Sequence, residues 1–373
     1  MIHSLLPVFL VGVVGASVWV VGLIEGVAES TALIVKVFSG TLSDYLGKRK
    51  TLAVFGYGLG AASKPLFALA STAGMVFGAR MIDRVGKGIR GAPRDALVAD
   101  LAPAELRGAS FGLRQALDTV GAFVGPLLAM GLMLLWANDF RAVFWVAVLP
   151  AFLAVALLLF GVREPTSTNP APRTNPISRQ NLKRLGAPYW WVVGIGAVLT
   201  LARFSEAFLI LRVQQGGLPL AFAPLVLVAM NLAYSAFAYP FGKLADSTSH
   251  FKLLIVGLLA LIAADALLAW GGHPALAWFG VSLWGLHMAM TQGLLATMVA
   301  DTAPSTLRGT AYGFYNLVSG LAMLLASVLA GLLWDRLGAR YTFAVGGVFA
   351  MVAVLLIVSY RRVHQGPVVA NGV

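Results

Sequence analysis

The chain of 373 residues contains no cysteine and few charged residues. The absence of thiols excludes disulfide bonds, thiolate metal sites and cysteine nucleophiles. Asp, Glu, Lys and Arg make up 11% of the chain, against about 25% in typical soluble domains. Hydrophobic residues make up 59%, and apolar runs of about 20 residues, which can cross a bilayer, recur along the whole length. These features predict an all-α, multi-pass membrane protein that contacts the lipid bilayer.

The charges that are present are biased in sign and in position. The chain has 27 Lys and Arg against 15 Asp and Glu, a net charge of +12. The basic residues form no single exposed patch, so nucleic-acid binding is not predicted. Fifteen of them lie in loops on the same side as the segment 163–187, and four lie in the opposite loops. The positive-inside rule therefore places that segment and the C-terminus in the cytoplasm.

The segment 163–187 is basic and rich in proline, so it cannot be a membrane helix. We expect an N-terminal helix bundle at 1–162, a cytoplasmic linker at 163–187, a C-terminal bundle at 188–362 and a cytoplasmic tail at 363–373. The spans expected after the N-terminal region cover about 51–71, 75–100, 109–135, 141–162, 188–212, 220–242, 252–271, 276–302, 309–333 and 341–360.

The N-terminal region can be divided in two ways. One helix could cover residues 2–24, which carry no formal charge. If instead 18–43 is one helix, only about 15 residues precede it, too few at 1.5 Å per residue for a core of about 30 Å. We favour the second division, in which the first membrane helix is incomplete.

The two halves of the sequence repeat each other. Residues 98–112 match residues 299–313 at nine of fifteen positions, and Gly40-x-Leu-x-Asp44 recurs as Gly242-x-Leu-x-Asp246 at nearly the same offset. Repeats related by an axis along the membrane normal are typical of transporters that bind substrate between the halves. The repeat predicts two six-helix bundles in a parallel pseudo-twofold arrangement.

The segment 80–100 concentrates charge in the middle of an apolar chain. At helical spacing its cations and Asp83 share about a third of the helix circumference. A charge at the bilayer centre costs about 2.5–3.5 kcal/mol on insertion scales, so this face must line protein or water. We expect it to line a polar pathway; the cations are Arg80, Arg84, Lys87, Arg90 and Arg94.

Several acidic residues are candidates for proton coupling. Glu25 and Glu29 share one helix face, and they fit a coupling pair and a structural ion pair equally well. Asp83 beside Arg84 fits a proton switch or an internal salt bridge. Asp118, one turn from Arg114, is a further candidate.

Polar residues within the spans of the second half are cavity candidates, because polar groups in membrane helices are commonly functional. These are Arg203, Glu206, Asn231, His287, Gln292 and Tyr315. Without cysteine or a histidine cluster we expect no metal site, and we expect no cofactor. Charged residues at cytoplasmic helix ends are candidate gate contacts between the halves: Asp44, Arg49, Asp100 and Arg107, with Asp246, Asp301 and Arg308 from the second half.

Two motifs resemble those of the major facilitator superfamily. The segment 40–50 resembles the loop signature between the second and third helices of that family, with Tyr45 where the family usually has arginine. Arg84-x-x-Lys87-Gly88 resembles its fourth-helix motif, whose arginine is associated with proton coupling, although Arg90 replaces the second glycine of that motif.

The resemblance extends along essentially the whole chain. Gly112, Gly121, Gly125 and Pro126 have the spacing of the fifth-helix signature of antiporters in the family, although 129–130 lacks its closing glycine pair. Segments 83–96 and 284–288 are similar to those of bacterial members that are mostly unassigned efflux or drug-resistance-like permeases. Such members usually have more first helix, with an acidic segment just before the position of Met1; if translation starts upstream of Met1, the additional segment could carry further coupling carboxylates.

The resemblance implies the two-bundle fold of that superfamily and secondary transport in the bacterial inner membrane. Proton-coupled export of a small organic molecule by a monomer is the expected function, in the manner of drug:proton antiporters. The basic residues favour an anionic or zwitterionic substrate, and the absence of a phosphate-binding GxxxxGK[ST] loop leaves ATP-driven pumping unsupported. Proton-coupled uptake of a metabolite, metal-ion export and an intramembrane enzyme remain alternatives.

Overall fold

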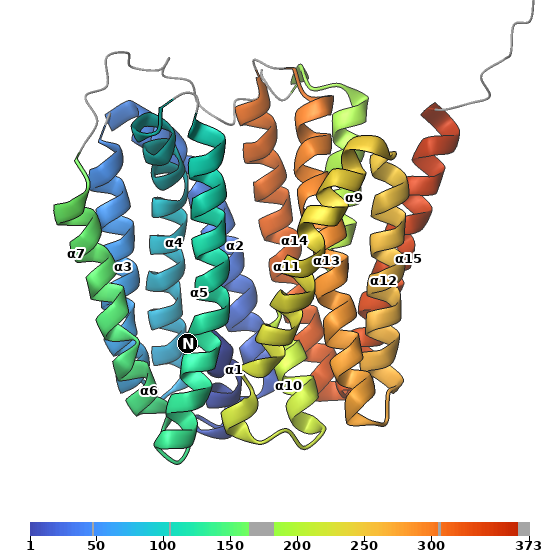
Figure 1. The fold of residues 1–373 in the computed structure, drawn as a ribbon. Helices are drawn as coiled ribbons and strands as arrows, with labels where there is room; N and C mark the ends of the chain where they lie inside the picture. Colours follow the sequence, from blue (N-terminus) through green and yellow to red (C-terminus); the bar gives the residue numbers. More distant parts are fainter. Residues whose placement is uncertain (47, 104–105, 164–182, 305–306, 365–373) are drawn as a thin grey trace, which may run out of the picture.

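The computed structural model describes residues 1–46, 48–103, 106–163, 183–304 and 307–364, which are largely helical and contain no strand. Figure 1 shows two bundles side by side. The first bundle consists of α1 (Ile2–Gly12), α2 (Val18–Leu46), α3 (Arg49–Leu69), α4 (Ala73–Leu101), α5 (Arg107–Leu135), α6 (Phe140–Val146) and α7 (Val148–Gly161). The second consists of α9 (Ala187–Ala202), α10 (Ala207–Gln215), the 3₁₀ turn η2 (Leu220–Phe222), α11 (Leu225–Ser247), α12 (His250–Trp270), α13 (Pro274–Thr302), α14 (Arg308–Leu337) and α15 (Ala339–His364).

The prediction of an all-α membrane protein with two bundles is confirmed. Among the described residues, nine helical segments are long and apolar enough to cross a membrane. The helices α4 and α13 are more polar, and each has 29 residues, enough to cross as well. Most of the expected linker at 163–187 and of the expected tail at 363–373 lies outside the described residues.

The N-terminal region follows the second of the two divisions. The helix α1 has 11 residues and ends at Gly12, and α2 begins at Val18. At 1.5 Å per residue, α1 is about 16 Å long, roughly half the thickness of a hydrocarbon core. A single helix over residues 2–24 is therefore wrong.

Two spans that we expected to be continuous are interrupted. The span 141–162 is divided at Ala147 into α6 and α7, and the span 188–212 is broken between Ala202 and Ala207. At the second break, Ser205 Oγ accepts a hydrogen bond from the backbone N–H of Ala207 at 3.3 Å. A short hydroxyl side chain that bonds to nearby backbone competes with helical hydrogen bonding. We name residues 203–206 the α9–α10 break.

The two bundles contact each other most extensively along α2 and α14, which run antiparallel. Small residues allow this approach: a Cβ added to Gly22 would lie 2.3 Å from the Ser327 carbonyl oxygen, and one added to Gly331 would lie 2.8 Å from the Trp19 Cα. Small residues spaced four apart are typical of closely packed membrane helices. The contact continues to Gly26, whose added Cβ would lie 3.0 Å from the Ser327 Cβ.

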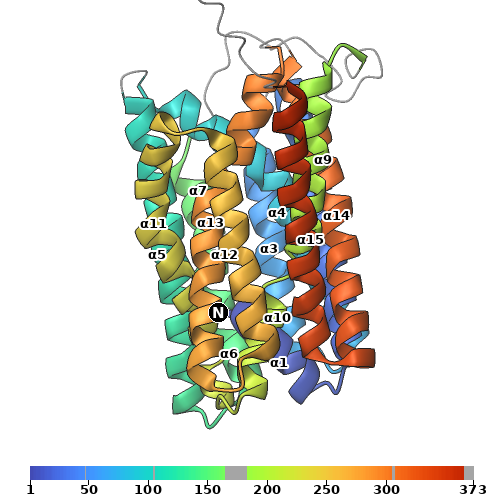
Figure 2. The same cartoon turned by 90° about the vertical axis from the view of Figure 1, so that its right-hand side faces the viewer.

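The α2–α14 interface is closed at the end where α2 begins and α14 ends. There the Asp335 carboxylate accepts hydrogen bonds from the backbone N–H groups of Val18 at 3.1 Å and Trp19 at 2.9 Å. A carboxylate at a helix N-terminus satisfies free N–H groups and complements the helix dipole. Figure 2 views the second bundle from outside, with α15 in front.

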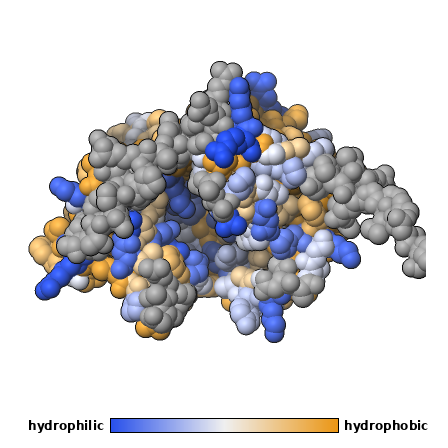
Figure 3. All heavy atoms as spheres, turned by 90° about the horizontal axis from the view of Figure 1, so that it is seen from above, coloured by the Kyte–Doolittle hydropathy of each residue, from blue (hydrophilic) through white to orange (hydrophobic). Residues whose placement is uncertain are grey.

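The opposite face of the molecule is hollowed. Figure 3 looks onto the face at which α2 ends and α14 begins, and hydrophilic side chains gather around a depression near its centre. The bundles are thus joined at one end and separated at the other, which is the geometry expected of one end state of alternating access.

Candidate functional site

A cavity of about 290 Å³ lies between the two bundles, and we name it the central cavity. Both halves contribute to its lining, and so does the α9–α10 break. Charged groups of both signs face it together with aromatic and sulfur-containing side chains. The lining residues are His3, Glu29, Arg84, Lys87, Arg203, Phe204, Ser205, Glu206, Trp284 and Met323.

The first-bundle wall of this cavity is backed by a buried ion pair. Arg80 Nη2 donates a hydrogen bond to Glu25 Oε2 at 2.6 Å and lies 3.0 Å from His3 Nδ1. The side chains of Arg80 and Glu25 are 2% and 1% exposed. A buried charge is tolerated when it is paired and hydrogen-bonded, so this pair holds α2 against α4.

Glu29, one turn further along α2, reaches the cavity surface. Arg84 Nη1 donates to Glu29 Oε1 at 2.8 Å, Lys87 Nζ lies 3.7 Å from Oε2, and Arg80 lies 3.8 Å from Oε1. The Glu29 side chain is 27% exposed. Three cations around one accessible carboxylate form a site in which a ligand or a proton can compete for the same contacts.

Asp83 belongs to the same group of charges. Lys64 Nζ of α3 donates to Asp83 Oδ1 at 2.5 Å, and Arg84 Nε lies 3.4 Å from Oδ2. Both partners also line a second cavity of about 340 Å³ within the first bundle. We name the whole group the charge network; its members are Glu25, Glu29, Lys64, Arg80, Asp83, Arg84 and Lys87.

Lys64 and His3 were not singled out from the sequence. Lys64 is a lone lysine in the otherwise apolar span 51–71, which could have identified it as an intramembrane charge that needs a partner. His3 Nε2 lies 3.9 Å from Glu206 Oε2 and brings the first bundle next to the α9–α10 break. The charge network has four cations and three carboxylates, so this wall carries one excess positive charge.

In the second bundle, the α9–α10 break presents two opposite charges to the central cavity. Arg203 forms no ion pair within 4.0 Å and no side-chain hydrogen bond among the described residues, although Glu206 is close enough to attract it electrostatically. The Glu206 side chain is 30% exposed, and its Oε2 lies 3.9 Å from His3 Nε2. A cation and a carboxylate with free bonding capacity can each take the opposite charge of a ligand.

Three sequence candidates lie outside the central cavity as described. Arg90 lies 4.5 Å from the centre of the Tyr57 ring, between α3 and α4. Arg94 and Asp118 belong to a separate group of charges between α4 and α5, in which Arg114 Nη1 lies 3.2 Å from Asp95 and 3.4 Å from Asp118. The charged residues that share one face of α4 therefore meet different neighbours along the length of the helix.

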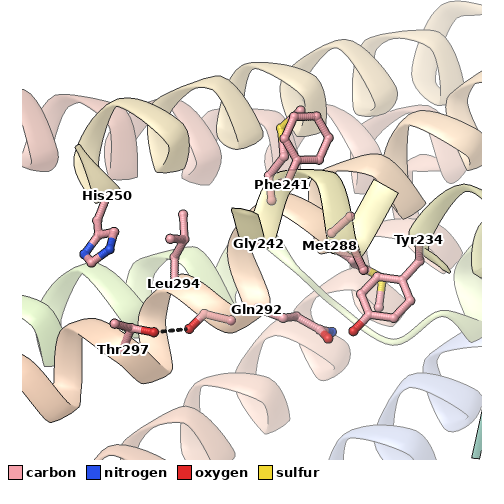
Figure 4. Close-up of a pocket in the computed structure, with 12 residues that line it drawn as sticks. Tyr234, Phe241, Gly242, His250, Met288, Gln292, Leu294 and Thr297 are labelled. Carbon is pink, nitrogen blue, oxygen red and sulfur yellow. Dashed lines mark hydrogen bonds between the residues drawn. The ribbon is translucent and has the colours of Figure 1, made fainter. Parts of the chain in front are cut away.

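A further cavity of about 230 Å³ lies between α11, α12 and α13 (Figure 4). Tyr234 and Gln292 point toward each other across it, and Met288 lies beside them. Asn231 instead donates to the Leu227 carbonyl at 2.8 Å, one turn back on α11. The predicted cavity residue Gln292 thus lines this pocket of the second bundle.

The remaining two candidates of the second bundle pack between helices. His287 is fully buried, with Nδ1 3.0 Å from the Gly257 carbonyl oxygen of α12. The Tyr315 ring of α14 approaches α9 closely, because a Cβ on Gly196 would lie 2.6 Å from Tyr315 Cε2. Neither is among the central-cavity residues of the described chain.

The structure describes some of the predicted gate residues. Arg49 forms an ion pair with Asp100, which joins α3 to α4 inside the first bundle. Asp301 lies 3.9 Å from His250, and Arg308 Nε donates to the Ala300 carbonyl at 3.3 Å. In this conformation these contacts lie within one bundle. The side chains of Asp44, Arg107 and Asp246 lie outside the described residues.

The predicted antiporter-like motif lies on α5. A Cβ on Gly121 would meet nothing within 4 Å, whereas one on Gly125 would lie 3.2 Å from the Met1 nitrogen. Pro126 is buried in the same helix, and Gly112 lies near its start, where side-chain surroundings are not described.

The described residues contain no group of three or more His, Cys, Asp or Glu that could hold a metal ion.

This geometry agrees with comparisons to known proteins. The sequence model of the Major Facilitator Superfamily matches residues 1–327 and 217–371. The chain belongs to this superfamily. It is therefore a multi-pass secondary transporter and not an enzyme, as the fold and the resemblance predicted.

Relatives within the Major Facilitator Superfamily cover nearly the whole chain. The uncharacterized MFS-type transporter MJ1317 of Methanocaldococcus jannaschii is 32% identical over 366 residues, with 96% of this chain and 89% of the relative covered. The inner membrane transport protein YajR of Escherichia coli is 25% identical, with 94% and 77% covered. The staphylopine export protein of Staphylococcus aureus is 22% identical, with 93% and 88% covered.

Solved structures of transporters share the fold. A point mutant of the nucleoside transporter NupG superposes with a TM-score of 0.78 at 14% identity, covering 97% of this chain and 94% of that chain. A POT family transporter in complex with 5-aminolevulinic acid superposes with a TM-score of 0.76 at 12% identity, covering 96% and 92%. These similarities show the architecture that the superfamily membership implies.

Proposed function

We propose that this transporter exports a small zwitterionic organic compound in exchange for protons, and that its hollowed face lies on the cytoplasmic side of a bacterial inner membrane. The excess of Lys and Arg in the loops on that side supports the orientation. The antiporter-like glycine spacing of α5 and the similarity to an exporter support the direction.

The observation that carries this proposal is the pair of opposite charges with free bonding capacity at the α9–α10 break. A substrate ammonium group would bind the Glu206 carboxylate, and a substrate carboxylate would bind the Arg203 guanidinium. A proton on Glu206 removes the negative charge that the ammonium needs, so proton and substrate exclude each other at this carboxylate. Mutual exclusion at one site, combined with alternating access, gives exchange.

Glu29 supports a second candidate, cotransport of a proton with an anion. An anion that binds Arg84 and Lys87 must displace the Glu29 carboxylate from both cations. A displaced carboxylate in a largely desolvated site is stabilised by taking up a proton. Proton and anion would then bind together, which corresponds to uptake in the direction of the proton gradient.

Everted vesicles that are energised and loaded with a pH-gradient dye distinguish the two candidates. Under exchange, a zwitterion added outside should release lumenal protons and restore the dye fluorescence. Under cotransport, fluorescence should recover only when the compound is preloaded in the lumen. A panel of amino acids, peptides, organic acids, cationic drugs and metal salts serves as the set of compounds. Vesicles with no response to any amine-bearing compound would contradict the proposed exchange.

Glu206→Gln should reduce substrate-driven proton release by at least about tenfold, because the loss of a charge-assisted hydrogen bond of about 1.5–3 kcal/mol alone weakens substrate binding by that much. Gln keeps the shape of the side chain but cannot exchange a proton. Glu29→Gln should have the larger effect if cotransport is correct. Proton release measured in vesicles with equal amounts of each variant checks this, and an unchanged response in Glu206→Gln would remove this residue from the mechanism.

A further inference from the structure

Asp265 in α12 is a buried carboxyl group that the proposed exchange does not use. Its residue is 1% exposed, and neither carboxylate oxygen has a hydrogen-bond partner among the described residues. An ionised carboxylate without a partner in apolar surroundings is far less stable than a protonated one. The group therefore either carries a proton or holds a cation.

The surroundings of Asp265 connect it with the α9–α10 break. A Cβ built on Gly346 of α15 would lie 2.9 Å from Asp265 Oδ2, 3.0 Å from the Phe204 ring and 3.4 Å from the Ala202 carbonyl oxygen. These three groups thus surround one point beside Gly346. Phe204 also lines the central cavity, so this residue borders both that cavity and the region of the carboxyl group.

A proton fits this position better than a metal cation. Hard cations take about six or more oxygen ligands, and the described residues contain no group of three or more His, Cys, Asp or Glu around Asp265 that could hold a metal ion.

The charged and titratable groups on the neighbouring elements are engaged elsewhere or face the cavity. Arg212 of α10 donates to the Leu268 carbonyl at 2.6 Å, and His287 of α13 contacts the Gly257 carbonyl. Arg340 of α15 lies 5.4 Å from the centre of the Trp270 ring. The α9–α10 break contributes Arg203 and Glu206, which line the central cavity, and none of these groups forms an ion pair with Asp265 within the described chain.

We propose that Asp265 is a second proton-binding site of the transport cycle. In the conformation seen here it holds a proton behind Phe204. When residues 203–206 rearrange as the bundles rock, the carboxyl group becomes accessible to water of the central cavity and exchanges this proton. The role of Asp265 in the transport cycle rests on the proposed proton coupling. The protonation of Asp265 does not, and it can be tested without any transport.

A carbodiimide that modifies protonated carboxyl groups in apolar surroundings provides this test. The full-length protein in proteoliposomes would be treated with dicyclohexylcarbodiimide at about pH 6 and at about pH 9, and modified peptides would be quantified by mass spectrometry. We expect modification of Asp265 that is greater at the lower pH. Asp83, which is paired with Lys64 and Arg84, serves as the internal control and should remain unmodified.

The transport role is tested with Asp265→Asn, which mimics the neutral carboxyl group. Exchange of a labelled zwitterion that releases protons from wild-type vesicles should be retained without a proton gradient, whereas the pH dependence of its net transport should shrink to the part that Glu206 contributes. Retained exchange also shows that the variant folds. An unmodified Asp265 in the wild-type chain would overturn the proposal, and so would a wild-type pH profile in Asp265→Asn. Sodium-dependent protection of Asp265 from the carbodiimide would also overturn it, in favour of a cation site.

Because carbodiimide labelling requires no proton flux, it separates this proposal from the proposed exchange. Wild-type transport without proton movement, together with pH-dependent labelling of Asp265, would contradict exchange and keep Asp265 as a proton-binding site. If proton-coupled transport persists but Asp265 is not labelled, the proposed exchange would stand and Asp265 would not be a proton-binding site.

Discussion

Gly22→Leu is expected to lower the transport rate by about 5- to 150-fold, because the leucine side chain cannot fit against Ser327. Overpacking of this kind costs about 1–3 kcal/mol, which corresponds to that factor in the equilibrium between two conformations. The Cβ alone would lie 2.3 Å from the Ser327 carbonyl oxygen, and backbone atoms yield less readily than a side chain. The variant should therefore favour the conformation in which this end of the α2–α14 interface is open.

The absence of native cysteine makes this measurable with a single introduced thiol. Ser30→Cys replaces a buried residue of the same interface. Its reaction with an impermeant maleimide, added on the side of the membrane opposite the hollowed face, reports the opening of the closed end. Labelling should be faster in the Gly22→Leu background. Gly58→Leu is the matched control, because an added Cβ there meets nothing within 4 Å. Equal transport and equal labelling in both variants would show that closure of this interface does not limit the cycle.

Arg80→Met is expected to destabilise the protein by about 3–5 kcal/mol, since it leaves the buried Glu25 carboxylate without its main partner. The double variant Glu25→Gln with Arg80→Met removes both charges and should regain more than half of the lost thermal stability. Arg94→Met is the matched control, because Arg94 is 28% exposed and its ion pairs are long; such pairs contribute about 0–1 kcal/mol.

The measurement is the midpoint of thermal unfolding of each purified variant in detergent, monitored by loss of the monodisperse peak in size-exclusion chromatography. A double variant that is no more stable than Arg80→Met would show that the unpaired Glu25 charge is not the cause. The contact between Arg80 Nη2 and His3 Nδ1 would then be the next one to test by mutation.

Sequence reasoning identified much of the fold and part of the site, and the reasons differ from residue to residue. The cost of burying charge placed Arg84 and Lys87 beside a cavity, because a span with several cations has few other solutions. The same argument placed Arg90 there too, yet Tyr57 of α3 provides it with a partner inside the bundle. Helical angle alone cannot indicate which neighbour a face meets at each depth.

Features that depend on contacts between distant residues were beyond the sequence. Lys64 pairs with Asp83 across two helices, and His3 approaches Glu206 across the two bundles. The α9–α10 break depends on a local hydrogen bond of Ser205 within an apolar run that predicts a continuous helix. The repeat between the halves, by contrast, involves identical residue types at nearly the same offset, and it correctly predicted two bundles.

The concentration of charge in the first bundle also constrains how the chain is made. The helix α4 brings Arg80, Asp83, Arg84 and Lys87 into the membrane, and each such charge on an isolated helix costs about 2.5–3.5 kcal/mol at mid-bilayer. Its partners are on α2 and α3, which are synthesised earlier. We therefore expect the translocon to retain α2 and α3 until α4 emerges, so that the three helices enter the lipid together as one preassembled unit.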